Sequence, residues 1–159
     1  MRVDVVCVGK LKENYWRQAV AEYTKRLGRY HKLDIIELAD EKAPETMSPA
    51  QEAEVRRKEG ERILKAIRDD AFVVALAIDG EGLSSEGLAT FLGTKAVHGV
   101  SHIVFVIGGS LGLSAEVLSR ADYKLSFSSM TFPHQMMRVI LLEQIYRAEK
   151  INRKEPYHK

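Results

Sequence analysis

The sequence is poor in cysteine and has no apolar run long enough to cross a membrane. Its single cysteine, Cys7, excludes an internal disulfide and any metal site built from a cysteine cluster. The longest uninterrupted apolar stretch, residues 71–78, contains eight residues, whereas a membrane-spanning helix needs about 20. Asp4 stands where a signal peptide requires its apolar segment. These absences predict a cytoplasmic protein that uses no metal.

The chain also lacks an excess of charge of either sign, because 24 Lys and Arg residues nearly balance 22 Asp and Glu residues. This balance hides an uneven distribution. Residues 10–32 carry seven basic and two acidic residues, residues 34–61 carry four and nine, and residues 124–159 carry seven and three. Two basic segments that flank an acidic one are compatible with a phosphate-binding face, and a solvated surface of mixed charge explains the same counts.

Strand and helix patterns alternate along the chain. A length of 159 residues predicts a single domain over residues 1–159, and 45% hydrophobic residues exclude a disordered chain. The predicted strands are 3–8, 33–38, 71–78, 103–107 and 123–127, and the predicted helices are 16–30, 49–68, 85–97, a short one after Ser114, and 133–150. This alternation predicts an α/β fold with a mostly parallel sheet flanked by helices.

Three consecutive predicted strands end in loops that suit a ligand. They are followed by Asp79–Gly82, by the glycine-rich turn 108–112, and by residues 127–133, where small hydroxyl residues lie between two aromatic ones. Glycines let a backbone approach a ligand closely, and parallel sheets bind ligands at the carboxyl ends of their strands. The turn 108–112 lacks the lysine of a P-loop and does not fit G-x-G-x-x-G. Taken alone, it is equally compatible with a tight turn that binds nothing.

No lysine or acidic cluster accompanies these loops, which disfavours a phosphorylated ligand. A neutral or zwitterionic ligand packed against Phe127, Met130 and Phe132 fits better. His134 at a helix start and His158 in the tail are the candidate acid–base groups. Cys7 lies inside an apolar strand and fits the core better than the role of a nucleophile.

The last predicted helix is apolar on far more than one stripe. Between Met136 and Ala148 its apolar residues occupy most of the helix surface, so the helix must be covered on several sides. We expect the sheet to cover one side and a second subunit to cover another, for example at Leu142 and Tyr146. Burial entirely within one chain is the alternative.

Three blocks of the sequence combine into a specific pattern: LAIDGEGLSS at 76–85, FVIGGSLGL at 105–113, and SFSSMTFPHQMMRVILLEQIYRA at 126–148. The opening VGKLK at 8–12 and the terminal PYHK at 156–159 belong to the same pattern. Together they resemble the RlmH family, bacterial pseudouridine N3-methyltransferases of the SPOUT class that act on the large ribosomal subunit. The resemblance covers essentially the whole chain.

The resemblance implies a SPOUT-type domain with a C-terminal trefoil knot, a homodimer, and S-adenosylmethionine as cofactor. It also implies methylation of N3 of a pseudouridine in the 23S rRNA of the assembled ribosome. In a trefoil knot the chain threads through one of its own loops. This breaks the ordinary rule that protein chains do not knot, and no hydrophobic periodicity predicts it. Carried onto this sequence, the cofactor-binding residues are Leu76, Gly108, Phe127, Ser128, Ser129, Met130, Thr131 and Phe132.

The same resemblance implies that the polar tail folds over an active site, either its own or that of the partner subunit. The acceptor N3–H must lose its proton, which requires a base or a cation that favours the anion. The implied catalytic residues are His158, Tyr157 and Arg153, and the implied rRNA-binding residues are Lys159 and Arg138. A tail that is simply frayed is the alternative.

Glu155 departs from the family pattern, in which a small residue precedes Pro156. If the tail lies against rRNA, the carboxylate of Glu155 opposes the phosphates. We therefore expect that replacing Glu155 with glycine leaves ribosome binding equal or stronger.

Two other classes of function are compatible with parts of the sequence. A dinucleotide-dependent oxidoreductase would use the glycine-rich turn, but the glycine spacing fails and no ribose-binding acid follows it. A non-catalytic ribosome-binding protein would need only the basic segments and a dimer. Comparing the binding of S-adenosylmethionine with that of NAD distinguishes a methyltransferase from an oxidoreductase. Transfer of a methyl group to ribosomes distinguishes a methyltransferase from a protein that only binds the ribosome.

Overall fold

Strands and helices alternate throughout the computed structural model, which describes residues 1–42 and 44–159. The elements are β1 (Arg2–Val8), α1 (Asn14–Leu27), β2 (Lys32–Leu38), α2 (Pro49–Ala66), β3 (Phe72–Gly82), α3 (Ser85–Val97), β4 (His102–Ile107), α4 (Ala115–Arg120), β5 (Tyr123–Ser126) and α5 (His134–Asn152). Each predicted element is present, with ends that shift by a few residues. Within the described ranges, none of the helices has the length and apolar character that crossing a membrane requires.

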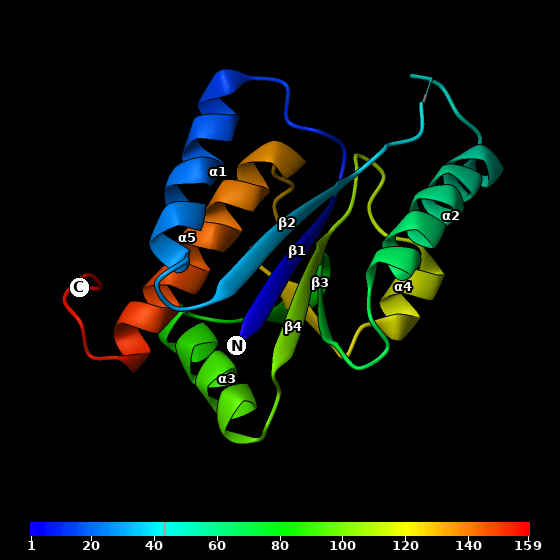
Figure 1. Ribbon diagram of the computed structural model, residues 1–159. Helices are drawn as coiled ribbons and strands as arrows, with labels where there is room; N and C mark the ends of the chain where they lie inside the picture. The colour runs from blue at the N-terminus through cyan, green and yellow to red at the C-terminus, as the bar shows by residue number, and fades with distance from the viewer. Residues whose placement is uncertain (43) are drawn as a thin grey trace.

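All five strands are parallel and follow the order β2-β1-β4-β3-β5. Helices α1, α3 and α5 cover one face of the sheet, whereas α2 and α4 cover the other (Figure 1). Because the connections pass over the faces, the central strands are buried on both sides and consist of continuous apolar runs. The predicted α/β fold with a parallel sheet flanked by helices is confirmed.

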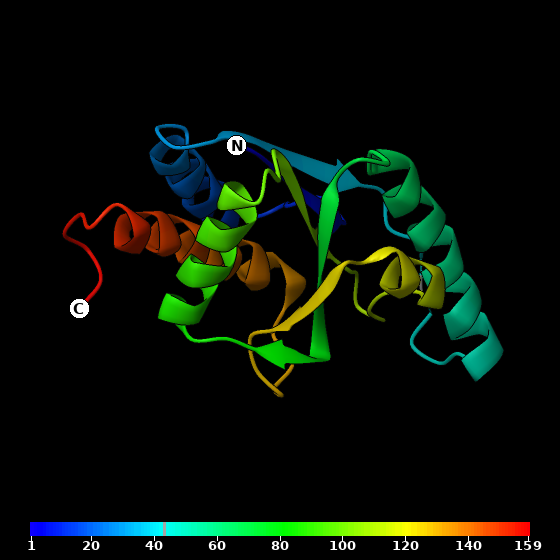
Figure 2. The same cartoon turned by 90° about the horizontal axis from the view of Figure 1, so that it is seen from below.

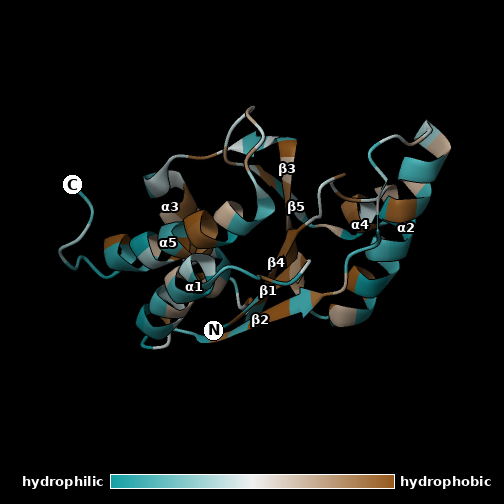
Figure 3. Cartoon of the chain, turned by 90° about the horizontal axis from the view of Figure 1, so that it is seen from above, coloured by the Kyte–Doolittle hydropathy of each residue, from teal (hydrophilic) through white to brown (hydrophobic). Residues whose placement is uncertain are grey.

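The core forms two clusters, one on each face of the sheet. The larger lies under α1, α3 and α5 and includes Val5, Phe105 and Leu141, and the smaller lies under α2 and α4 and includes Val6, Ile63 and Val106. Figure 3 shows the central strands largely brown, with teal on the outer turns of α1 and α2. Cys7 lies in the larger cluster, where burial raises the pKa of its thiol to about 11, so it is confirmed as a core residue.

Helix α5 is covered by its own chain to a greater extent than the apolar pattern predicted. It packs against α1 and α3, and Leu141, Leu142, Ile145 and Ala148 are fully buried there. The expectation that Leu142 contacts a second subunit is therefore wrong: this side chain has no surface left to offer. Tyr146 is half-buried, with its ring edge-on to Tyr157 at a centroid distance of 5.0 Å.

Strand β3 continues beyond the end of its apolar run and pairs with β5 a second time. Gly80, between the two paired segments, permits this second pairing. Leu76 and Glu81 both pair with Leu125, so residues 77–80 make an excursion between two paired segments. A Cβ at Gly80 would lie 2.7 Å from the carbonyl oxygen of Lys124, a separation that only glycine allows. The excursion places residues 76–78 at the edge where β3, β4 and β5 end.

Replacing Leu142 with alanine tests whether this residue belongs to the core. We expect the free energy of unfolding to fall by about 2–5 kcal/mol, because a fully buried leucine leaves a cavity. Urea denaturation measures the change. Val97→Ala is the matched control, since Val97 is 83% exposed and should change stability by less than about 0.5 kcal/mol. A variant that unfolds like the wild type but no longer self-associates would instead place Leu142 in an interface.

Candidate functional site

A cavity of about 630 Å³ opens at the carboxyl ends of β3, β4 and β5. Its walls come from the end of β3, the glycine-rich turn after β4, the loop after β5 and the first turn of α5. This is the edge at which parallel α/β sheets bind ligands, and the volume lies in the range of small-molecule sites. Three loops that are separate in the sequence therefore enclose one space.

Most of the predicted cofactor-binding residues line this cavity. Those that do are Leu76, Gly108, Phe127, Ser128, Met130, Thr131 and Phe132. Ser129 is exposed and is not among the described residues that line it. Ile78 and Met130 are 52% and 71% exposed although both are large and apolar, so the cavity offers an open apolar surface to a ligand.

The glycine-rich turn is held by its own backbone. The N–H of Gly112 donates to the carbonyl of Gly109 at 3.1 Å, and Gly112 has a φ of +82°, which favours glycine. A Cβ on Gly108 would lie 2.9 Å from the carbonyl carbon and oxygen of Gly112. Ser114 then begins α4, because its hydroxyl accepts a hydrogen bond from the N–H of Val117. The turn therefore has a defined shape against which a ligand can pack.

Serine hydroxyls connect the other two loops. The hydroxyl of Ser126 lies 2.8 Å from the carbonyl oxygen of Ile78, and the hydroxyl of Ser128 accepts from the N–H of Met130 at 3.0 Å. These contacts fix the loop after β5 beside the excursion of β3. Of the small hydroxyl residues predicted at 127–133, Ser128 thus shapes the cavity wall, and Ser126, the last residue of β5, ties this wall to β3.

His134 lies at the rim of the cavity, at the first turn of α5. Burial lowers the pKa of its imidazole, and the nearby Arg138 guanidinium lowers it further, so both favour the neutral form of the ring. A Cβ on Gly9 would lie 3.3 Å from Cε1 of His134. The loop that leaves β1 therefore passes directly beside the cavity rim.

Arg138 does not lie on the surface, so the prediction that it contacts rRNA is corrected. Its side chain is fully buried, and it donates to the Glu37 carboxylate at 2.8 Å and to the carbonyls of Val8 and Gly9 at 3.1 and 2.8 Å. With its guanidinium engaged inside the chain, Arg138 positions the loop after β1. Its place among apolar residues of α5 is the sequence signal for this burial.

The carboxyl-terminal tail lies away from the cavity of its own chain. Tyr157 and His158 contact Glu143 and Arg147, which follow His134 by nine and thirteen positions, or about 13 and 20 Å along a helix. Figure 2 places the carboxyl terminus at the outer end of the helical layer, beyond the end of α5. Among the described residues, none from the tail lines the cavity.

The tail is nevertheless held by specific contacts. The Tyr157 hydroxyl donates to the Glu143 carboxylate at 3.2 Å, and the Arg147 guanidinium lies 4.7 Å from the Tyr157 ring centroid. His158 lies between Arg147 and Glu86, at 3.1 and 2.7 Å. Since a guanidinium can only donate, Nδ1 of His158 accepts and Nε2–H donates to Glu86. The frayed tail considered from the sequence is not what the structure shows.

Arg153 and Lys159 lie on the outside of this segment. Arg153 is exposed, forms an ion pair with Glu149 at 3.1 Å, and lies 4.7 Å from the ring centroid of Tyr30. Lys159 is exposed at the chain end. Metal-binding groups of three or more His, Cys, Asp or Glu residues are absent from residues 1–42 and 44–159.

The sequence matches the family model described as "Predicted SPOUT methyltransferase" over residues 1–158. The chain therefore belongs to the SPOUT methyltransferase family. It is 64% identical, over the full length of both chains, to the Ribosomal RNA large subunit methyltransferase H proteins of Bifidobacterium animalis subsp. lactis and Bifidobacterium adolescentis. It is 60% identical, again over both full lengths, to the protein of the same name from Clostridioides difficile.

As a SPOUT methyltransferase the protein uses S-adenosylmethionine, and the cavity fits this cofactor. Ile78, Phe127 and Met130 offer apolar surface for an adenosine, and the turn at Gly108 offers backbone groups at close range. Among the residues that the structure describes, no lysine lines the cavity, which suits a ligand without phosphates. An oxidoreductase and a non-catalytic ribosome-binding protein are excluded by the family.

Glu155 is paired within its own chain, and the expectation that it opposes rRNA stays a prediction. Its carboxylate accepts from the Tyr30 hydroxyl at 2.7 Å and from the Lys150 ammonium at 2.8 Å. These two donors, the ammonium first, hold the pKa of Glu155 below its usual range. Glu155 therefore fixes the start of the tail to the turn after α1, through Tyr30, and to α5, through Lys150.

Replacing Gly108 with valine tests the cofactor cavity. The new Cβ would clash with the backbone of Gly112, so the turn must move and S-adenosylmethionine affinity should fall more than about tenfold. Isothermal titration calorimetry measures the affinity, and circular dichroism checks the fold. Gly82→Ala is the matched control, because a Cβ there meets nothing within 4 Å. Equal affinities for the two variants would remove Gly108 from the site.

Replacing Glu155 with glycine tests the tail anchor. Loss of the contacts to Tyr30 and Lys150 should expose residues 153–159 to faster proteolysis, while cofactor affinity stays unchanged because the cavity is remote. Limited proteolysis followed by mass spectrometry measures the rate. Glu22→Gly, which removes a solvent-exposed carboxylate from α1, is the control. Unchanged cleavage in the Glu155 variant would mean that other contacts hold the tail.

Proposed function

We propose that this SPOUT methyltransferase methylates N3 of a pseudouridine in the 23S rRNA of the assembled ribosome, in the cytoplasm and as a homodimer. The observation that carries the proposal is full-length identity of 60–64% to relatives named for methylation of large-subunit rRNA. The cavity at the three loops supports it, because those loops are the cofactor segments implied by the resemblance. The C-terminal trefoil knot belongs to the same proposal.

The reaction requires a methyl donor, a bound base and removal of one proton. S-adenosylmethionine supplies an activated methyl group when bound. The chain must hold the acceptor nitrogen in line with that group and favour loss of the N3 proton. We assign proton removal and base binding to His158, Tyr157 and Arg153, and phosphate contact to Lys159. His134, whose neutral form is favoured and which already lies at the cavity rim, is the alternative proton acceptor.

The proposed catalytic residues act on the cavity of the partner subunit. Within one chain they lie too far from the cavity to touch a ligand there. In a two-fold dimer the same patch contacts itself, so an axis near the middle of α5 brings each tail to the start of the other α5. Met136 and Ile140, one turn apart on α5, are half-buried and belong to neither core cluster, which supports an interface there.

Transfer of labelled methyl from S-adenosylmethionine to ribosomes lacking the modification tests the proposed reaction. We expect incorporation into 23S rRNA, mapped by mass spectrometry to N3 of one pseudouridine. Free 23S rRNA serves as the comparison substrate. Absence of transfer to both substrates would contradict the proposed function.

Heterodimers test whether the site is shared between subunits. A chain lacking residues 156–159 is paired with a Gly108→Val chain, so that each partner supplies what the other lacks. A shared site should give about half the wild-type rate per heterodimer, because one of its two sites is intact. Each homodimer alone should lose a factor of about 10² or more.

The control heterodimer carries both changes in one chain and none in the other. A shared site makes this heterodimer inactive, because each of its sites is missing one part. If the tail acts on its own chain, the first heterodimer is inactive and the control heterodimer shows about half the wild-type rate. About half the wild-type rate in both heterodimers would contradict any role of the tail, because each of them keeps one intact cavity.

A further inference from the structure

The loop after β1 is held beside the cavity rim through its buried residues Gly9 and Leu11, whereas Lys10 and Lys12 between and after them are exposed. Arg138 donates to the carbonyls of Val8 and Gly9, and Leu11 is bonded through its N–H to Glu37 at 2.8 Å. The Arg17 guanidinium then donates to the Leu11 carbonyl at 2.9 Å. Four hydrogen bonds thus fix this loop, which starts next to His134. A surface loop without such bonds would be expected to be mobile.

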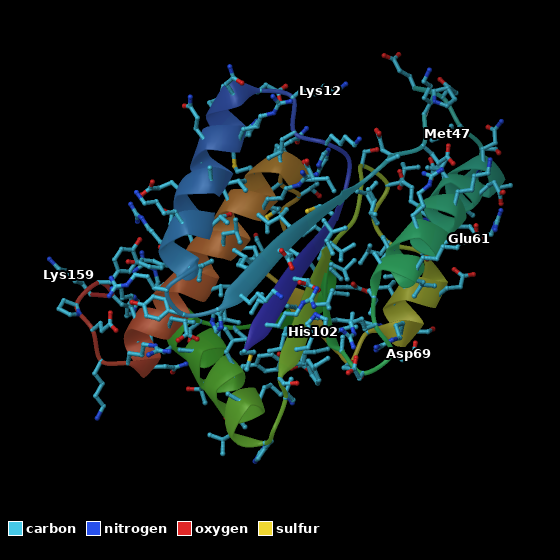
Figure 4. All side chains as sticks on the ribbon, in the orientation of Figure 1. Lys12, Met47, Glu61, Asp69, His102 and Lys159 are labelled. Atoms are coloured by element: carbon cyan, nitrogen blue, oxygen red, sulfur yellow. The ribbon has the colours of Figure 1, made fainter. Side chains whose placement is uncertain are left out.

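This loop carries cations that the fold does not use. Lys10 and Lys12 are exposed, and neither forms an ion pair with any described residue. Residues 10–17 contain three basic residues and one acidic residue, Glu13. Figure 4 shows Lys12 at the end of the molecule where α1 begins, far from Lys159 at the tail. The cations therefore lie on the cavity side, where the tail of the same chain supplies none.

An exposed aromatic side chain follows directly. Tyr15 is 63% exposed, and its ring meets the Trp16 ring edge-on at a centroid distance of 5.2 Å. Trp16 in turn packs against the larger core cluster and so holds Tyr15 in place. Ile78 and Met130 are exposed because they line the cavity, but Tyr15 does not line it. Its exposure needs another explanation.

We propose that residues 10–16 form a platform that binds the rRNA strand next to the target nucleotide. Tyr15 stacks on an unpaired base, and Lys10 and Lys12 contact the adjacent phosphates. Single-stranded RNA is recognised by such combinations of aromatic faces and backbone cations. Lys10 directly follows Gly9, on which a Cβ would lie 3.3 Å from Cε1 of His134, so the platform lies within a few residues of the cavity rim. This inference rests on the proposed function and names the part of the enzyme that holds its substrate.

Kinetics on ribosomes test the platform. Tyr15→Ala should raise the KM for ribosomes about tenfold or more, because stacking on one base is lost. Tyr15→Phe keeps the ring and should restore the wild-type KM. Both variants should keep the affinity for S-adenosylmethionine, measured by calorimetry, because Tyr15 lies outside the cavity. Val97→Ala, another exposed apolar position, is the control and should change nothing.

The salt dependence tests the lysines. Replacing Lys10 and Lys12 together with alanine should make the plot of log KM against log salt shallower by about 1.4, since each contact to a single strand contributes about 0.7. The charge-matched control replaces Lys25 and Lys58, which are exposed on α1 and α2. Its slope should equal that of the wild type.

Three results separate the possible failures. Wild-type KM values for both Tyr15→Ala and the Lys10/Lys12 variant would overturn the platform while leaving the proposed function intact. A dimeric wild type and a monomeric Tyr15→Ala variant in light scattering would show that a second copy of the chain covers this surface, which also overturns it. Absence of methyl transfer by the wild type would contradict the proposed function itself.

Discussion

The buried guanidinium of Arg138 is the contact on which the cavity edge depends. One side chain of α5 donates to the end of β1 at Val8 and Gly9, and to the carboxylate of Glu37 in β2. A buried charge is tolerated only when it is paired and hydrogen-bonded, so these partners hold α5 and both strand ends in one arrangement. The first turn of α5 carries His134, and the loop after β1 carries Lys10 and Lys12. Arg138 therefore positions both sides of the cavity entrance.

Close packing behind the glycine-rich turn provides the second constraint. Gly60 of α2 leaves no room for a side chain, since a Cβ there would lie 2.4 Å from the Ser114 hydroxyl. The neighbouring carboxylate of Glu59 lies 3.2 Å from where a Cβ of Gly109 would be, and burial raises its pKa. Helix α2 thus supports the turn from the face opposite α5. The largely charged sequence of α2 is typical of a surface helix, so it does not predict that Gly60 and Glu59 pack behind the glycine-rich turn.

A cavity at one end of α5 and an ordered tail at the other make two incomplete halves. Among the described residues, the cavity offers apolar surface and backbone groups but no lysine or arginine, and none of Tyr157, His158 and Arg153 lines it. In the proposed homodimer, two-fold symmetry joins such halves without any further element, because each chain supplies what its partner lacks. The proposed dimer also brings the proposed platform of residues 10–16 and the partner's tail to one cavity. A chain of 159 residues can thereby assemble a site for a large RNA substrate.

The sequence by itself determined the parallel α/β fold, because its apolar runs and helical spacings depend only on local geometry and burial. It also determined the cavity loops, since glycines and small hydroxyl residues after successive parallel strands must meet at one edge. Only the tertiary structure decided the places of Arg138, Glu155 and Leu142. Each is ambiguous from its residue type, because whether a charge or an apolar side chain faces solvent depends on partners distant in the chain: Glu37 for Arg138, Tyr30 for Glu155, and the packing of α1 and α3 for Leu142.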